Sequence, residues 1–150
     1  MDIKQKLAAT QETVIKATAQ AIWDKMATDD GMKNWLGPSE YEAKEGGKIV
    51  FNVNEGDIRY VMFGEVVMYD PPNELAFTWT EQTVGGRTWD TPTLVTITLT
   101  PEDDGTRVRL VHSGFEQLPA DIAQKEYEGY VHGWEIRKVL DYLKSAVEEN

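Results

Sequence analysis

The feature that most constrains the fold is a change of period along the chain. Between residues 39 and 113, short segments of alternating apolar and polar side chains are separated by turn sequences rich in Gly, Pro, Asp and Asn. Such alternation is typical of half-buried antiparallel strands. After Pro119 the alternation ends, and a helix is predicted from Asp121 almost to Asn150. A run of strands followed by one long helix indicates the α+β class.

Turn chemistry bounds six or seven expected strands. The clearest turns are Gly46-Gly47, residues 70–73 and residues 102–105, because glycine adopts positive φ and proline cannot donate to a sheet ladder. The strands are predicted at residues 10–16, 39–45, 49–54, 58–69, 74–82, 93–100 and 106–113.

Two short helices are expected between the first and second strands. Thr18 is a good N-cap for a helix over Ala19 to Met26, which carries apolar residues at helical spacing. Asp29 or Asp30 is expected to cap a second, brief helix that ends near Trp35.

Length and composition limit the classes of protein to consider. The chain has 150 residues, which fits a single domain over residues 1–150. Its net charge is −11, and no run of Lys and Arg offsets it, so binding to nucleic acid is not expected. The absence of cysteine excludes disulfides, thiolate nucleophiles and Cys-based zinc sites.

The sequence also predicts where the protein resides. No apolar run approaches the roughly 18 residues of a membrane-spanning helix, so membrane insertion is not expected. The first six residues lack the apolar core of a signal peptide. A cytoplasmic protein, monomeric or weakly dimeric, is therefore the expectation.

Parity along each strand predicts which side chains face the core, because successive side chains point to opposite faces of a sheet. In the strand at 58–69 the inward candidates are Tyr60, Met62, Val66 and Met68, although both parities are apolar there. In the other long strands the inward sets are Leu75, Phe77, Trp79, Val95, Ile97, Leu99, Val108, Leu110 and His112.

The predicted long helix carries two apolar stripes on nearly opposite faces. One stripe contains Ile136, Leu140, Leu143 and Val147, and the other contains Tyr127, Tyr130 and Trp134. Gly129 and Gly133 fall on the first stripe, although a glycine inside a helix costs about 1 kcal/mol relative to alanine. Close approach of the helix to the sheet, a kink near Gly133, or room for a bound molecule would each offset that cost.

Several short sequences resemble one protein family in their order and spacing. They are Ile15-x-Ala17 with Ile22-Trp23, Trp35-x-Gly37-Pro38, Gly46-Gly47, Gly64-x-Val66, Pro71-Pro72-x-x-Leu75-x-Phe77-x-Trp79, Gly105-Thr106, His112-x-Gly114-Phe115 and Gly133-Trp134. Over nearly its whole length, the chain resembles homologues of the activator of heat-shock chaperone ATPase, within the START, polyketide-cyclase or SRPBCC superfamily.

The resemblance implies a helix-grip fold, in which a curved antiparallel sheet wraps a long C-terminal helix and two short helices close one end. It also implies a deep apolar pocket between sheet and helix. Relatives in the superfamily bind lipids, sterols, phenolics or polyketides, and a minority catalyse cyclisation or dehydration. The family has no shared catalytic motif, so the resemblance assigns no catalytic residue.

The candidates for ligand binding are side chains expected around that pocket. They are Tyr60, Met62, Phe77, Trp79, His112, Tyr130 and Trp134. Aromatic rings suit flat apolar ligands, and His112 would be either a polar handle or a neutral core histidine bonded to a backbone carbonyl or to Ser113. Trp89, in a polar loop, is the candidate for a lid over the pocket mouth, with simple docking on the surface as the alternative.

No catalytic constellation is visible in the sequence. It contains no Ser-His-Asp order, phosphate loop or metal-binding cluster in a supporting context, so neither a metal nor a cofactor is expected. His132 has no second histidine nearby. Glu81 shares the parity of Trp79 and would lie either at the cavity mouth or at a solvated strand end.

Three functional hypotheses follow from these observations. The leading one is a small-molecule binding protein that holds an apolar, aromatic or lipid-like ligand between sheet and helix. The second is a cyclase, dehydratase or hydrolase that uses the same cavity, with His112 or Tyr60 as acid or base, although the sequence favours a role without catalysis. The third is a chaperone-linked or stress-linked module that binds a protein partner through an exposed apolar patch around Trp35, Trp89 or Trp134.

Overall fold

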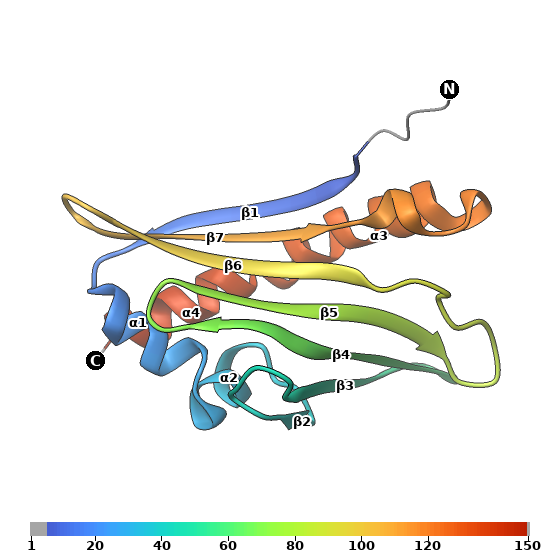
Figure 1. The fold of residues 1–150 in the computed structure, drawn as a ribbon, viewed down its shortest axis with the longest axis horizontal. Helices are drawn as coiled ribbons and strands as arrows, with labels where there is room; N and C mark the ends of the chain where they lie inside the picture. Colours follow the sequence, from blue (N-terminus) through green and yellow to red (C-terminus); the bar gives the residue numbers. More distant parts are fainter. Residues whose placement is uncertain (1–5, 150) are drawn as a thin grey trace.

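The computed structural model describes residues 6–149, and these residues form one curved antiparallel sheet with the helices gathered on one side of it (Figure 1). The strands are β1 (Ala8–Ile15), β2 (Glu40–Tyr41), β3 (Lys48–Glu55), β4 (Ile58–Asp70), β5 (Glu74–Thr83), β6 (Thr93–Glu102) and β7 (Gly105–Ser113). Their order across the sheet is β1-β7-β6-β5-β4-β3-β2. The α+β class and the helix-grip arrangement are confirmed.

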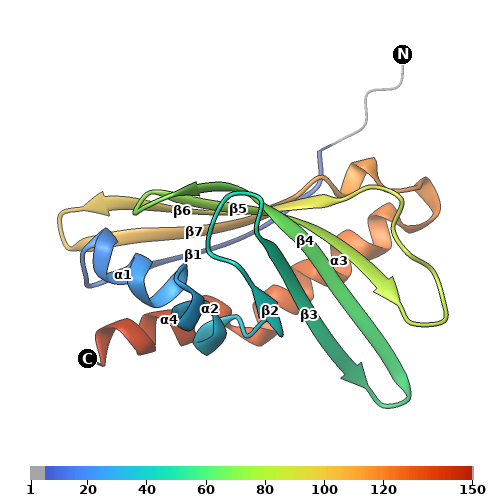
Figure 2. The same ribbon diagram turned by 60° about the horizontal axis from the view of Figure 1, so that its bottom comes forward.

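The helices close the concave side of the sheet (Figure 2). They are α1 (Ala19–Met26), α2 (Asp29–Trp35), a short 3-10 turn η1 (Phe115–Gln117), α3 (Ala120–Arg137) and α4 (Val139–Glu148). The core between the two layers is almost entirely apolar, and the buried polar side chains among residues 6–149 are Thr93, Thr106 and His112.

The two short helices lie where the sequence predicts them, with one change of cap. Thr18 Oγ1 accepts a hydrogen bond from the Ala21 amide at 3.1 Å, as expected for an N-cap. The cap of α2 is Thr28, which accepts from the Gly31 amide, rather than Asp29 or Asp30. Asp29 instead accepts from the amide of Ala43 at 3.1 Å, because α2 packs beside the segment that follows β2.

The second strand is much shorter than the predicted 39–45. Only Glu40 and Tyr41 pair with β3. The amide of Lys44 turns back to the Glu42 carbonyl, and the amide of Gly47 turns back to the Lys44 carbonyl, so residues 42–47 form successive turns. The first strand is displaced from the predicted 10–16 to Ala8–Ile15.

A β-bulge in β4 changes which side chains face the core. The pairing with β5 shifts between Val66 and Met68. Met62 and Val66 are buried as expected, but Met68 is 38 % exposed. The extra residue of the bulge reverses the parity, so that Tyr69 faces inward and packs edge-on against Trp23 at 5.3 Å.

The long C-terminal helix is interrupted. Lys138 has φ 50° and ψ 43°, a left-handed conformation that ends α3 and starts α4. The break lies beyond Gly133, where a kink was one of the alternatives. It rotates α4 relative to α3, so that Trp134 before it and Leu140 after it both face the core, although a continuous helix would place them far apart around its axis. Ile136, expected on the Leu140 stripe, is 64 % exposed as a result.

Candidate functional site

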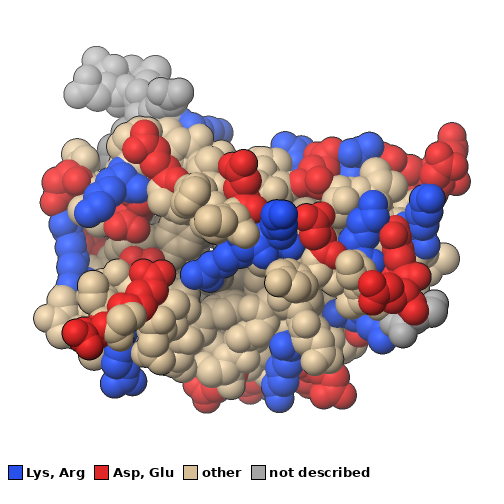
Figure 3. Space-filling view, turned by 180° about the vertical axis from the view of Figure 1, so that it is seen from behind, with Lys and Arg blue, Asp and Glu red and all other residues tan. Residues whose placement is uncertain are grey.

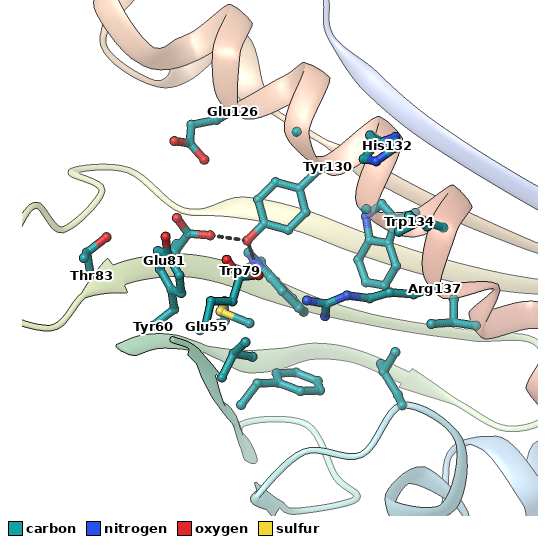
Figure 4. Close-up of a pocket in the computed structure, with 18 of the residues that line it drawn as sticks. Glu55, Tyr60, Trp79, Glu81, Thr83, Glu126, Tyr130, His132, Trp134 and Arg137 are labelled. Carbon is teal, nitrogen blue, oxygen red and sulfur yellow. Dashed lines mark hydrogen bonds between the residues drawn. The ribbon is translucent and has the colours of Figure 1, made fainter. Parts of the chain in front are cut away.

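A cavity of about 870 Å³ lies between α3 and the concave side of the sheet. Strands β3, β4 and β5 form one wall and α3 the other, and the helix break at Lys138 and the end of α2 border it (Figure 4). The face of the molecule seen from behind is hollowed, and acidic and basic side chains border the hollow (Figure 3). The apolar and aromatic lining is Trp35, Leu36, Phe51, Val53, Tyr60, Met62, Trp79, Tyr130, Trp134, Ile136, Val139 and Tyr142.

Five of the seven predicted binding residues line this cavity. They are Tyr60, Met62, Trp79, Tyr130 and Trp134. The other two, Phe77 and His112, are 0 % exposed and do not line it. Phe77 packs against Trp79 from within the core, with ring centroids 6.3 Å apart.

Both ring nitrogens of His112 are used inside the core. Trp134 Nε1 donates to His112 Nδ1 at 3.1 Å, and an indole N–H can only donate, so Nδ1 must carry the lone pair. Thr93 Oγ1 donates to the Trp79 carbonyl at 2.8 Å and therefore accepts from His112 Nε2 at 2.7 Å. Burial lowers the pKa of His112 to about 3. His112 is thus a neutral core histidine, but its partners are Thr93 and Trp134 rather than Ser113 or a backbone carbonyl.

A second hydrogen-bonded chain reaches the cavity itself. Trp79 Nε1 donates to Tyr130 Oη at 2.9 Å, and Tyr130 Oη donates to Glu81 Oε1 at 2.6 Å (Figure 4). Burial, with the charge of Glu81 beside it, raises the pKa of Tyr130 well above its ordinary value, so the phenol keeps its proton. The chain ends on a carboxylate held in one orientation at the cavity wall.

Acidic side chains gather at this end of the cavity. Glu55 lies at the end of β3, Glu81 near the end of β5, and Glu126 in α3, and all three line the cavity. Burial raises the pKa of Glu81, the hydrogen bond from Tyr130 opposes that shift, and the charge of Glu55 adds to it. Burial and the charge of Glu81 raise the pKa of Glu126, while Lys125 and Arg87 lower it.

Sequence reasoning singled out Glu81 but left its position open, and it missed Glu126 and Arg137. The parity shared with Trp79 was the signal for Glu81, and the structure places it at the cavity rather than at a solvated strand end. Glu126 and Arg137 carry no such signal. They reach the cavity only because α3 crosses this part of the sheet.

The two helical glycines open the cavity rather than bring backbones together. A Cβ built on Gly129 or on Gly133 would meet no heavy atom within 4 Å, and both residues line the cavity. Close approach of the helix to the sheet, one of the readings of these glycines, is therefore wrong.

Trp89 is buried and does not line the cavity. It is 6 % exposed, and its ring packs edge-on against Phe115 and Tyr130. Its loop is attached to α3 by an ion pair between Arg87 and Asp121 at 2.8 Å. The exposed patch expected around Trp35, Trp89 or Trp134 is not formed by these indoles, because all three are at most 7 % exposed.

No group of three or more His, Asp or Glu side chains placed to hold a metal ion occurs within residues 6–149. Over the same part of the chain, no helix is both long and apolar enough to cross a membrane.

The fold and the cavity together define a helix-grip protein with an aromatic-lined pocket. The sequence matches the family described as Activator of Hsp90 ATPase homolog 1-like protein over residues 16–148, and the chain belongs to that family. No curated protein matches the chain.

Solved structures share the fold. Protein MLL2253 from Mesorhizobium loti superposes with a TM-score of 0.75 at 23 % identity, covering 95 % of this chain and 98 % of that one. ChR145 from Cytophaga hutchinsonii gives a TM-score of 0.67 at 26 % identity, covering 99 % and 97 %. The protein described as the Aha1 dimer from Colwellia psychrerythraea gives 0.63 at 23 % identity, covering 95 % and 96 %.

Proposed function

We propose that this protein binds an apolar small molecule in the cavity between the sheet and α3. The observation that carries the proposal is a cavity of about 870 Å³ walled by aromatic side chains, which is within the range of ligand-binding pockets. Polar and charged side chains also line the cavity, and three of them, Glu55, Glu81 and Glu126, gather at one end, where they can fix the orientation of a ligand held by the aromatic walls.

The glycines of α3 support this proposal. Each glycine costs about 1 kcal/mol of helix stability relative to alanine. Steric crowding does not explain them, because a Cβ at either position would meet no neighbouring atom. Space kept open at that expense, beside Trp134 and Tyr130, is what a bound molecule needs.

The other two hypotheses have less support. Of the two acid or base candidates of the enzyme hypothesis, His112 would be out of reach of a ligand, because the ring is fully buried and both nitrogens are hydrogen-bonded. Tyr60 does line the cavity and is the candidate that this hypothesis keeps. A protein partner docked on exposed indoles would need side chains that are instead buried at Trp35, Trp89 and Trp134.

Substitutions at Gly133 that fill the cavity are expected to affect the stability of the protein and its ligand binding in opposite directions. Gly133→Ala is expected to stabilise the protein by about 1 kcal/mol, because alanine is the better helix former and its methyl group meets open space. Gly133→Leu is expected to be at least as stable as the wild type but to bind the neutral fluorescent probe phenylnaphthylamine about tenfold more weakly or worse, because the side chain occupies the cavity.

Urea denaturation measures the first effect, and the fluorescence gain of phenylnaphthylamine measures the second. Gln124→Leu is the control, since it places the same side chain at an exposed position of the same helix outside the cavity. Binding to Gly133→Leu at wild-type strength, with the variant folded, would show that the probe does not enter this cavity.

A further inference from the structure

The polar end of the cavity restricts the ligand more than the apolar walls do. We infer that the cavity takes an amine, whose ammonium group binds the Glu81 carboxylate while its apolar body lies along Trp79. The inference rests on the proposed function, since it names the chemical class of molecule that the same cavity holds.

Hydrogen-bond direction is the first support. The proton of Trp79 Nε1 is donated to Tyr130 Oη, and the single proton of Tyr130 is donated to Glu81 Oε1. The chain therefore ends in an acceptor. Glu81 Oε2 makes no hydrogen bond to any other of residues 6–149, so it is a free acceptor on a carboxylate whose orientation is already fixed. A ligand that complements this wall must bring a donor.

Charge decides which donor fits best. No Lys, Arg or His nitrogen within residues 6–149 lies within 4.0 Å of the carboxylates of Glu55, Glu81 or Glu126. A neutral hydroxyl would satisfy Oε2 but leave the repulsion between these carboxylates unchanged, and a ligand carboxylate would add to it. An ammonium supplies the donor and offsets the repulsion, and charge-assisted hydrogen bonds are about twice as strong as neutral ones.

The aromatic walls favour the same group. Tyr60, Trp79 and Tyr130 all line the cavity near Glu81 (Figure 4). A cation beside aromatic faces in a partly desolvated site gains cation–π stabilisation of about 0.5 to 2 kcal/mol.

Two cations also line the cavity, and neither neutralises this end. Lys125 is exposed, and its charge lowers the pKa of Glu126 by less than burial and Glu81 raise it. Arg137 enters the cavity on the other side of Trp79 from Glu81 in Figure 4. An amine with its head on Glu81 therefore keeps its charge at the acidic end, while its apolar body extends toward Arg137.

The test compares three probes that share one apolar body. Naphthylethylammonium, naphthylethanol and naphthylacetate are titrated into the protein at neutral pH by isothermal titration calorimetry. The ammonium is expected to bind about tenfold more tightly than the alcohol, and the acetate more weakly than both. This comparison needs no variant.

Glu81→Gln then assigns the preference to one side chain. Glutamine keeps an acceptor for Tyr130 and removes the charge, so the ammonium is expected to lose most of its advantage while the alcohol binds as before. Glu135→Gln is the matched control, because it removes one negative charge from an exposed position of α3 outside the cavity.

The outcomes separate the inference from the function on which it rests. Equal binding of the three probes, tightest binding of the acetate, or a preference for the ammonium that survives Glu81→Gln would overturn the inference and leave an apolar binding site in place. Failure of all three probes to bind would overturn both.

Discussion

Gly64→Ala is expected to destabilise the protein by about 3 kcal/mol or more, which is at the upper end of overpacking effects. A Cβ built on Gly64 would lie 1.7 Å from the carbonyl oxygen of Thr78 and 2.9 Å from its Oγ1. The Oγ1 of Thr78 also accepts a hydrogen bond from the Glu65 amide at 2.9 Å. Because the clash is with backbone rather than with a flexible side chain, β4 and β5 would have to separate.

The free energy of unfolding in urea, with circular dichroism as the signal, measures this loss. Gly129→Ala is the comparison, since the same substitution there meets open space and should stabilise. A loss below about 1 kcal/mol for Gly64→Ala would contradict the close approach of β4 and β5, because overpacking normally costs more than that.

Acid is expected to destabilise the core through His112. The pKa of His112 is about 3 in the folded protein, below its ordinary value of 6.5. Between these values the unfolded chain binds the proton and the folded chain does not, so stability is complete above about pH 6.5 and is lost as the pH falls toward 3. The slope approaches about 1.4 kcal/mol per pH unit, which gives a loss of order 2 kcal/mol by about pH 5.

Glu81 and Glu126 have the opposite effect on the pH dependence of stability. Their raised pKa values mean that the folded protein takes up protons more readily, so their contribution to stability grows as the pH falls. A variant without His112 is therefore needed to isolate the effect of this histidine on the pH dependence of stability.

His112→Leu supplies that comparison. At neutral pH it is expected to cost about 1 to 3 kcal/mol, because the buried N–H of Trp134 loses its acceptor. The difference in unfolding free energy between wild type and His112→Leu should shrink as the pH falls from 7 to about 5, because the variant lacks the buried histidine, while His132 is present in both proteins. A difference that stays constant over this range would show that His112 does not resist protonation.

The sequence predicts the fold well where local rules act. Alternation correctly places Met62, Trp79 and Leu110 inward, because no irregularity interrupts the alternation at these residues. Thr18 caps α1 through a hydrogen bond from an amide only three residues further along the chain. The parity fails at Met68, because the bulge after Val66 depends on how β4 pairs with β5.

The helix break could be anticipated but not located. Apolar stripes on opposite faces of one straight helix cannot both pack on the same sheet. The sequence pattern therefore indicates that the helix is interrupted and that its second part is rotated about the helix axis. A glycine is the usual place for it, yet the left-handed residue is Lys138. Its position follows from where Trp134 and Leu140 contact the core, which is a tertiary constraint.

The site was predicted only in part, because some of its contacts also depend on tertiary structure. Parity and helical spacing identify Tyr60, Trp79 and Tyr130 as residues of the cavity. They cannot show that Tyr130, 49 positions away in the sequence, donates to Glu81, or that Trp134 donates to His112. Those contacts depend on how α3 lies across the sheet.

The most direct test of ligand binding in the cavity uses the five tryptophans as reporters. In a proton–nitrogen spectrum the indole N–H signals are followed while phenylnaphthylamine is added. Trp79 and Trp134 line the cavity between α3 and the sheet, and Trp35 lines its border at the end of α2, whereas Trp23 is buried against Tyr69 and does not line it. We predict saturable shifts that are largest for Trp79 and Trp134 and negligible for Trp23. Signals that do not move, or shifts centred on Trp23, would contradict the binding site described above.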